Sequence, residues 1–170
     1  MELPKICSNI VDLLLAGLLI FTVFWFVKIW LTAGEFELSL LDFIWNPSEA
    51  RELIAHLDPT QRQAHIWITE NLDVILPLSY GVLFAGSVWR FYPLNRAYFA
   101  VPALLAVGAD LIEGRIQILA LKGTTDLLNL KQFITPFKFG MVLLAIIIAS
   151  CGFTTYFNTL RKNRRKTMTP

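Results

Sequence analysis

Apolar residues gather along this chain in long runs that shorter polar segments separate. Four runs stand out, at about residues 9–31, 72–91, 98–121 and 134–157. Each is close to the roughly 20 residues that a helix needs to cross the hydrocarbon core of a bilayer. The pattern therefore predicts an all-α fold, an integral membrane four-helix bundle that forms a single transmembrane domain over residues 1–170.

The first connection, about residues 32–71, also carries helix signals. In "NPSEARELIAHL", Asn46 is a good N-cap and is followed by a proline at the first helical position. "DPTQ", beginning at Asp58, repeats this start signal. We therefore expect an extra amphipathic helix at 47–57 and a second helix at 59–71 that runs on into the next span. The short helix either packs over the bundle or lies on the membrane surface as a lid.

Charge sets the expected orientation. The segment "RKNRRK" holds five of the fifteen basic residues of the chain, and clusters of this kind stay on the cytoplasmic side. We expect a cytoplasmic basic tail at 158–170, and an even number of spans then places both termini in the cytoplasm of an inner (plasma) membrane protein. A site for anionic lipid or nucleic acid is the other interpretation of this tail. We expect a topology anchor and no nucleic-acid partner.

The first apolar run has a second interpretation, as a cleaved signal peptide. Only Lys5 precedes the run, the run is longer than a usual signal core, and no A-x-A site follows it. We expect an uncleaved span, although removal would leave the other three spans oriented in the same way.

Composition excludes several classes of protein. The chain is 55% hydrophobic and only 16% charged, whereas a soluble domain has about a quarter charged residues. No glycine-rich phosphate loop, nucleophile elbow or zinc-protease motif occurs. Cys7, Cys151, His56 and His65 lack the spacing of metal ligands. We therefore predict no cofactor and no metal site.

Charged residues inside the spans are the main functional signal. On a helical wheel, one face of the second span carries Glu70, Asp73, Pro77 and Tyr80, and one face of the third carries Asp110, Glu113, Gly114 and Gln117. Arg115 points away from that face. Because the fourth span descends from outside, Lys138 reaches a similar depth, near Lys131 and Thr135. These residues are expected to meet in the outer half of the bundle.

The expected cluster has an excess of negative charge. Lys138 alone cannot neutralise Asp73, Asp110 and Glu113, so a protonated carboxyl, a bound cation or His65 should contribute. A shared proton suits acid–base catalysis, but a structural hydrogen-bonded network can have the same composition. The candidate catalytic residues are therefore Asp110, Glu113, Asp73, Tyr80 and Lys138, with a functional site and a structural network both open.

Two motifs resemble a known family. "LDVILPLSYG" and "DLIEG" are similar to the paired L-D-x-x-x-P-x-x-Y-G and D-x-x-E-N elements of an uncharacterised family of small bacterial four-span membrane proteins. An outer helix that carries an arginine, here Arg62, also fits. The resemblance covers about residues 47–140 and includes Asp73, Pro77, Tyr80, Asp110 and Glu113. Gly114 stands where the family has asparagine. The resemblance implies the architecture and the cluster but no reaction.

Three kinds of function fit these observations. We expect a lipid- or partner-binding accessory protein, whose partners are membrane lipids, a second copy of the chain or another membrane protein. The alternative is a membrane enzyme that acts on a lipid or isoprenoid by carboxylate acid–base catalysis. The third is a proton-coupled carrier that would need to form an oligomer. The lack of a polar stripe below Asp110 disfavours transport.

Overall fold

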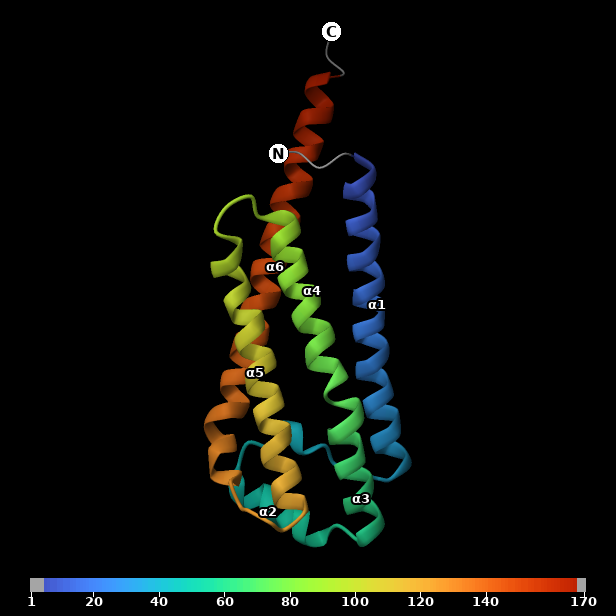
Figure 1. Ribbon diagram of the computed structural model, residues 1–170, viewed down its shortest axis with the longest axis vertical. Coiled ribbons are helices and arrows are strands. Elements are labelled where there is room, and N and C mark those ends of the chain that lie inside the picture. The colour runs from blue at the N-terminus through green and yellow to red at the C-terminus, as the bar shows by residue number, and fades with distance from the viewer. Residues whose placement is uncertain (1–4, 168–170) are drawn as a thin grey trace.

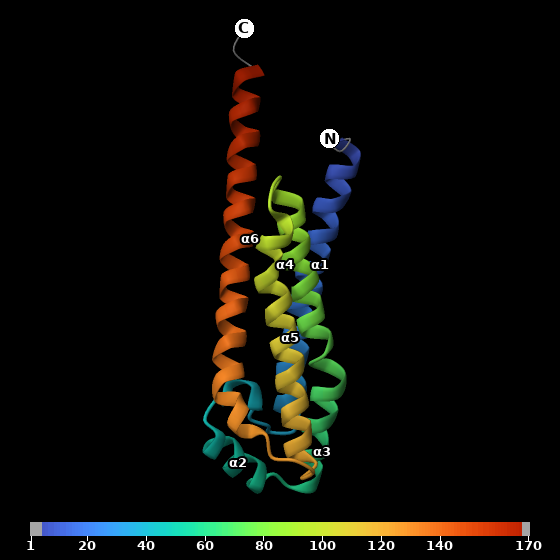
Figure 2. The ribbon, with the colours of Figure 1, turned by 60° about the vertical axis from the view of Figure 1, so that its left-hand side comes forward.

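In the computed structural model, which describes residues 5–167, the protein is a bundle of long helices without β-strands in that range. Four helical rods lie side by side, and the rods alternate in direction (Figures 1 and 2). They are α1 (Lys5–Glu35), the joined α3 (Pro59–Trp67) and α4 (Ile75–Phe91), α5 (Arg96–Leu121) and α6 (Lys131–Thr167). The start of α1 and the end of α6 lie at the same end of the bundle, and the connection after α1 closes the other end (Figure 1).

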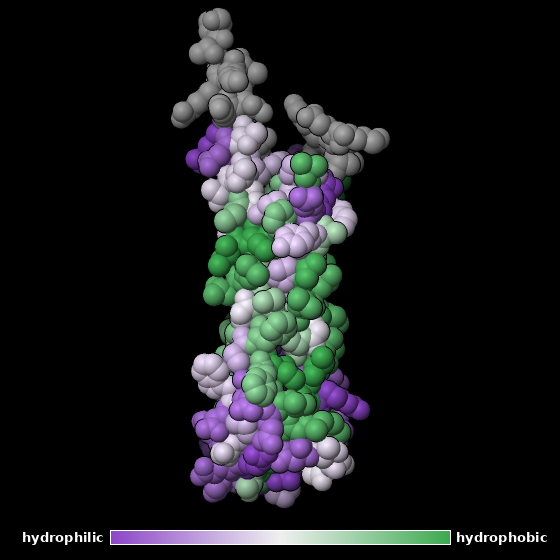
Figure 3. Space-filling model, turned by 90° about the vertical axis from the view of Figure 1, so that its left-hand side faces the viewer, coloured by the Kyte–Doolittle hydropathy of each residue, from purple (hydrophilic) through white to green (hydrophobic). Residues whose placement is uncertain are grey.

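Three helices are long and apolar enough to cross a membrane, namely Asn9–Glu35, Pro59–Phe91 and Leu128–Thr159. No residue in the most apolar window of α1 is buried, and side chains such as Leu13 and Ile20 are at least 70% exposed. A soluble protein rarely leaves so large an apolar surface uncovered. Figure 3 shows an apolar belt between two polar ends on one face of the molecule.

The other expected span, 98–121, is the helix α5, which is not among those three candidates. It packs against α4 and α6 along much of its length, and Ala103, Ala106 and Ala109 are buried in that contact. Small residues allow helix backbones to approach closely inside a membrane. The helix itself is confirmed. Helix α6 is longer than the expected span 134–157, because it stays helical into the basic tail.

The connection after α1 folds as expected from its start signals. Asn46 caps α2 (Pro47–His56) by accepting a hydrogen bond from the Ser48 backbone N–H. Asp58 and Gln61 form a reciprocal capping box at the start of α3. These contacts satisfy N–H groups that have no partner inside the helix. The helices at 47–57 and 59–71 are therefore confirmed.

Helix α2 lies across the end of the bundle and packs on its core. Its buried residues Ala50 and Ile54 contact a cluster that includes Ile116, Leu121 and Leu128. The α2–α3 turn is closed by Arg62, whose guanidinium donates to the Ile54 carbonyl oxygen. The arrangement matches the expectation of a packing helix that covers the bundle.

A π-helical turn, Ile68–Leu72, joins α3 to α4. Such a turn inserts one extra residue and rotates everything before it by about 100° relative to everything after it. For this reason Glu70 does not join Asp73 and Tyr80 in the charged cluster, as an uninterrupted helix would require. Glu70 is exposed and pairs with Lys122 at the end of α5, at 2.6 Å between Nζ and Oε1. The wheel-based placement of Glu70 is wrong.

Candidate functional site

Lys138 lies at the centre of the charged cluster. Its Nζ is 3.0 Å from Asp110 Oδ1, 2.7 Å from Glu113 Oε2 and 3.5 Å from Asp42 Oδ1. The side chain is only 6% exposed. Position 138 lies two turns into α6, where the helix faces α5, so the ammonium reaches carboxylates from that helix and from the connection after α1. One lysine thus links three elements of the fold.

Glu113 and Lys131 form the most deeply buried pair, and both side chains are 0% exposed. The Lys131 ammonium donates to Glu113 and also, at 3.0 Å, to the Leu41 carbonyl oxygen. Thr135 donates its hydroxyl to the same Glu113 oxygen. A buried charge is tolerated only when it is paired and hydrogen-bonded, and Glu113 and Lys131 satisfy both conditions within a closed hydrogen-bonded network.

Asp42 enters the cluster from a short 3-10 turn, Leu41–Phe43, that follows α1. Gln117 donates its side-chain amide to Asp42 at 3.2 Å. Burial opposes ionisation of Asp42, yet the positive charges of Lys138 and Lys131, together with that amide, hold the pKa of its carboxyl below the ordinary value. Asp42 is therefore an ionised member of the site.

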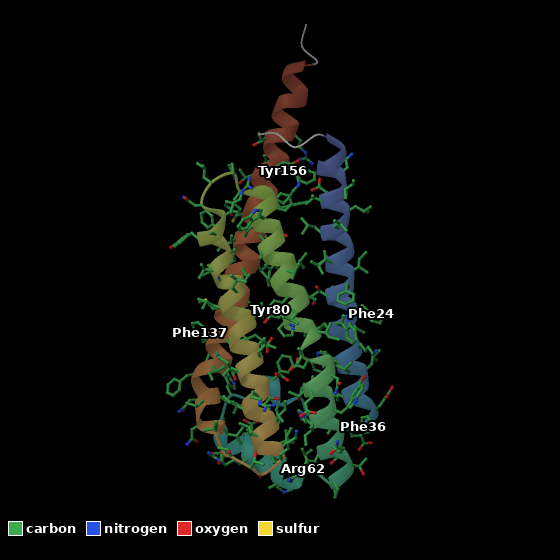
Figure 4. All side chains as sticks on the ribbon, in the orientation of Figure 1. Phe24, Phe36, Arg62, Tyr80, Phe137 and Tyr156 are labelled. Carbon is green, nitrogen blue, oxygen red and sulfur yellow. The ribbon has the colours of Figure 1, made fainter. Side chains whose placement is uncertain are left out.

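Tyr80 and Asp73 complete the site from α4 and the end of the π-helical turn. The Tyr80 hydroxyl donates to Asp110 Oδ2 at 2.8 Å. Figure 4 shows Tyr80 inside the bundle, whereas Phe24 and Phe137 point outward. The carboxylate of Asp73 forms no hydrogen bond or ion pair with any side chain in the described part of the chain.

The carboxylates outnumber the lysines. One oxygen each from Asp42, Asp73 and Asp110 lie within 4.8 Å of one another, so these three groups could hold a cation. Lys138 already supplies positive charge there, since it pairs with two of the three. Counting Glu113, four carboxylates face two lysines. A proton or a cationic group of a ligand must balance the remaining negative charge.

A pocket of about 290 Å³ opens beside this cluster. Lys138, Tyr80 and the three aspartates form its polar floor, and apolar side chains form its walls. The walls come from α1, from the 3-10 turn, from α4 and from α6: Val23, Phe26, Ile29, Trp30, Leu40, Phe43, Leu76, Phe84, Phe139 and Val142, with the Thr22 side chain. Several wall residues are 44–54% exposed. The pocket therefore opens sideways, between α1 and α6, onto the apolar surface of the bundle.

All five residues singled out from the sequence meet here. Asp73, Tyr80, Asp110 and Lys138 line the pocket, while Glu113 lies behind them with Lys138 as its partner. Arg115 is exposed, as the helical wheel predicts.

Sequence reasoning missed Asp42 and did not identify Lys131 as a second ammonium partner. The one signal for Asp42 is an acidic residue between apolar neighbours in "SLLDFIW". His65, the other suggested contributor, is fully buried on α3 and lies close enough to Asp42 for an electrostatic interaction.

No protein-family model, curated protein or solved structure matches this chain. The resemblance to small four-span bacterial proteins therefore stays a prediction.

Proposed function

We propose that this chain is a multi-pass membrane protein that binds a lipid in the pocket between α1 and α6. The lipid's apolar chain would lie against the pocket walls, and its polar headgroup would contact the carboxylates and Lys138. One observation carries the proposal: a single pocket combines an apolar wall, an apolar opening and a charged floor. Ligand sites commonly have this composition, a mostly apolar surface with few polar groups that fix orientation.

The charge of the floor indicates which headgroup would fit. Four carboxylates against two lysines favour a headgroup that donates hydrogen bonds or carries positive charge, such as a hydroxyl or an ammonium. An anionic headgroup would have Lys138 as its one ammonium partner in the pocket and would face three aspartates. We therefore propose a neutral or cationic amphiphile as the ligand.

The membrane arrangement is part of this proposal. We propose four spans, with α5 as the third, because α5 runs beside α4 and α6 and shares their buried interface. Both termini would be cytoplasmic, with the basic residues after Phe157 as the anchor. A reporter protein fused after Pro170 should be active only in the cytoplasm. A reporter that is active outside would overturn this orientation.

Lipid binding can be tested with paired substitutions on α6. Val142 lines the pocket, whereas its neighbour Leu143 is 60% exposed on the outer surface. The protein would be extracted in polymer-bounded native membrane discs and the retained lipids identified by mass spectrometry. Val142→Trp should remove a lipid that the wild type and Leu143→Trp both retain. Equal lipid retention in all three proteins would contradict the proposal.

Acid–base catalysis on a bound lipid is the second candidate function. The observation that favours it is the contrast between neighbouring carboxylates: Asp110 accepts hydrogen bonds from Tyr80 and Lys138, while Asp73 has no such donor among the described side chains. Pairs of carboxylates in different environments divide into proton donor and proton acceptor. An enzyme would convert the retained lipid, and Asp73→Asn would leave lipid retention intact while it stops the conversion.

A further inference from the structure

A second, smaller pocket reaches the same carboxylates from the opposite side. Its volume is about 180 Å³, and it lies between the π-helical turn and α5. The lining residues are Thr69, Glu70, Asp73, Val74, Asp110, Leu111, Gly114, Arg115 and Ile118. Asp73 and Asp110 belong to both pockets. The two aspartates therefore lie between the two pockets, with the apolar pocket on one side and this polar pocket on the other.

The chemistry at the edge of the polar pocket indicates contact with water. Glu70 and Arg115 lie there, and both are exposed. Glu70 pairs with Lys122, and their side chains are 39% and 44% exposed. Placing three charged side chains against lipid would be costly. This edge therefore belongs to the aqueous end of the bundle that α2 also covers (Figure 1).

Two local features of the backbone open this pocket. The π-helical turn places Glu70 at the rim and Asp73 at the base, whereas an unbroken helix would bring both to one face. Gly114 leaves space on the α5 side, because an added Cβ there would meet only the Thr69 methyl group, at an ordinary contact distance of 3.4 Å. A larger side chain at this position would project into the pocket.

We propose that the polar pocket is the aqueous entrance to the carboxylate site. Water and small neutral or cationic molecules would reach Asp73 and Asp110 through it, while a lipid occupies the apolar pocket. The site would then join two phases: the lipid enters sideways from the membrane, and a polar partner or a proton enters from the water. This inference rests on the proposed function only for the identity of the ligand on the apolar side.

Cysteine modification tests the entrance directly. In a full-length background with Cys7 and Cys151 replaced by serine, Asp73→Cys would place a thiol at the base of the pocket. The protein would be studied in phospholipid nanodiscs, with a cationic methanethiosulfonate reagent that stays in water. The thiolate attacks the reagent's sulfenyl sulfur, a mixed disulfide forms, and methanesulfinate leaves. The rate would be followed by intact-protein mass spectrometry.

Blocking each pocket separately gives the decisive comparison. Gly114→Leu should slow the modification of Asp73→Cys by about tenfold or more, because the larger side chain raises the activation free energy for the reagent to reach the thiol. Val142→Trp, which fills the apolar pocket, should leave the modification rate within about twofold of the rate for Asp73→Cys alone, because the reagent does not pass through that pocket. Leu111→Trp fills the polar pocket from a partly exposed position and serves as a second block if Gly114→Leu does not fold.

Two control cysteines define the limits of the assay. Glu52→Cys on the exposed side of α2 should react rapidly in every background, and Leu143→Cys on the lipid-facing surface should not react. An unreactive Asp73→Cys beside a reactive Glu52→Cys would overturn the inference. A block by Val142→Trp instead of by the polar-pocket variants would also overturn it. If Val142→Trp retains as much lipid as the wild type while the polar-pocket variants slow the reaction as expected, the proposed function alone is contradicted.

Discussion

Replacing Asp73 by asparagine should not destabilise the protein, although Asp73 lies in a charged cluster inside the bundle. Its carboxylate has no hydrogen-bond or ion-pair partner within the described residues, and it lies within 4.8 Å of the oxygens of Asp42 and Asp110. Asparagine has nearly the same shape and no charge. The substitution therefore removes repulsion between like charges and breaks no side-chain hydrogen bond or ion pair within the described residues. Replacing a buried polar residue usually has the opposite effect, because a hydrogen-bond partner is left unsatisfied.

The size of the effect follows from the distances. Two unit charges 4.8 Å apart repel by about 3 kcal/mol at an effective dielectric constant of about 20. Asp73 experiences this repulsion from two carboxylates, and the attraction of Lys138 offsets part of it. A proton held between the carboxyls would remove most of what is left. We expect the free energy of unfolding of Asp73→Asn to lie between the wild-type value and about 3 kcal/mol above it.

The assay is reversible unfolding in mixed micelles, followed by tryptophan fluorescence. Glu113→Gln is the matched control, because it also exchanges one carboxylate for an amide in the same cluster. Glu113 has three partners, Lys131, Lys138 and Thr135, so its replacement should cost about 3–5 kcal/mol. A loss of more than about 1 kcal/mol in Asp73→Asn, the net contribution of one ordinary hydrogen bond, would mean that the Asp73 carboxylate stabilises the fold after all.

Three further predictions concern packing and charge. Lys131→Met should lower the free energy of unfolding by about 3–5 kcal/mol because it leaves Glu113 short of a donor. Adding Glu113→Leu should recover part of that loss. If the effects of the two substitutions are strictly additive, Lys131 and Glu113 are not energetically coupled. Gly81→Ala should cost about 1–3 kcal/mol, since its Cβ would lie 2.4 Å from a Val107 methyl group, and Val107→Ala should rescue it in the same assay. Ionised Asp42 should contribute its full stabilisation above about pH 4, and this stabilisation should be lost as the pH falls through the lowered folded-state pKa of Asp42. If the unfolding free energy of Asp42→Asn lies equally far below that of the wild type at about pH 3 and at about pH 7, this prediction is wrong.

The sequence was sufficient for the features that local chemistry determines. The start of α2 at Asn46 and of α3 at Asp58 could be predicted because a cap and the N–H groups that it satisfies are only two or three residues apart. The faces of α4 and α5 that carry Tyr80 and Asp110 could also be predicted, because helical periodicity fixes which residues share a side.

The sequence was insufficient where position depends on distant contacts. Asp42 joins the site because a 3-10 turn folds into the bundle and meets Gln117, 75 positions along the chain. No local periodicity encodes that meeting. Glu70 was misplaced for a different reason: a helical wheel assumes 3.6 residues per turn, and a single π-helical turn breaks that assumption without an evident sequence signal.

The question of a structural network or a functional site has a different answer for different members of the cluster. Lys131 and Thr135 both donate hydrogen bonds to Glu113, and all three residues are at most 1% exposed. Groups of this kind hold elements together and offer nothing to a ligand. Asp73 is partly exposed, borders both pockets and has no side-chain partner in the described range.

A protein that used the cluster only for stability would gain by losing the Asp73 charge. Lys138 connects the two parts, because it pairs with Glu113 on the closed side and with Asp110 on the open side. We infer that the closed part fixes Lys138 so that the open part can bind a ligand. If the protein only binds a lipid, Asp73→Asn should keep or raise stability and lose binding, whereas Glu113→Gln should lose both. If Asp73→Asn keeps the lipid, the second candidate function, catalysis, is favoured.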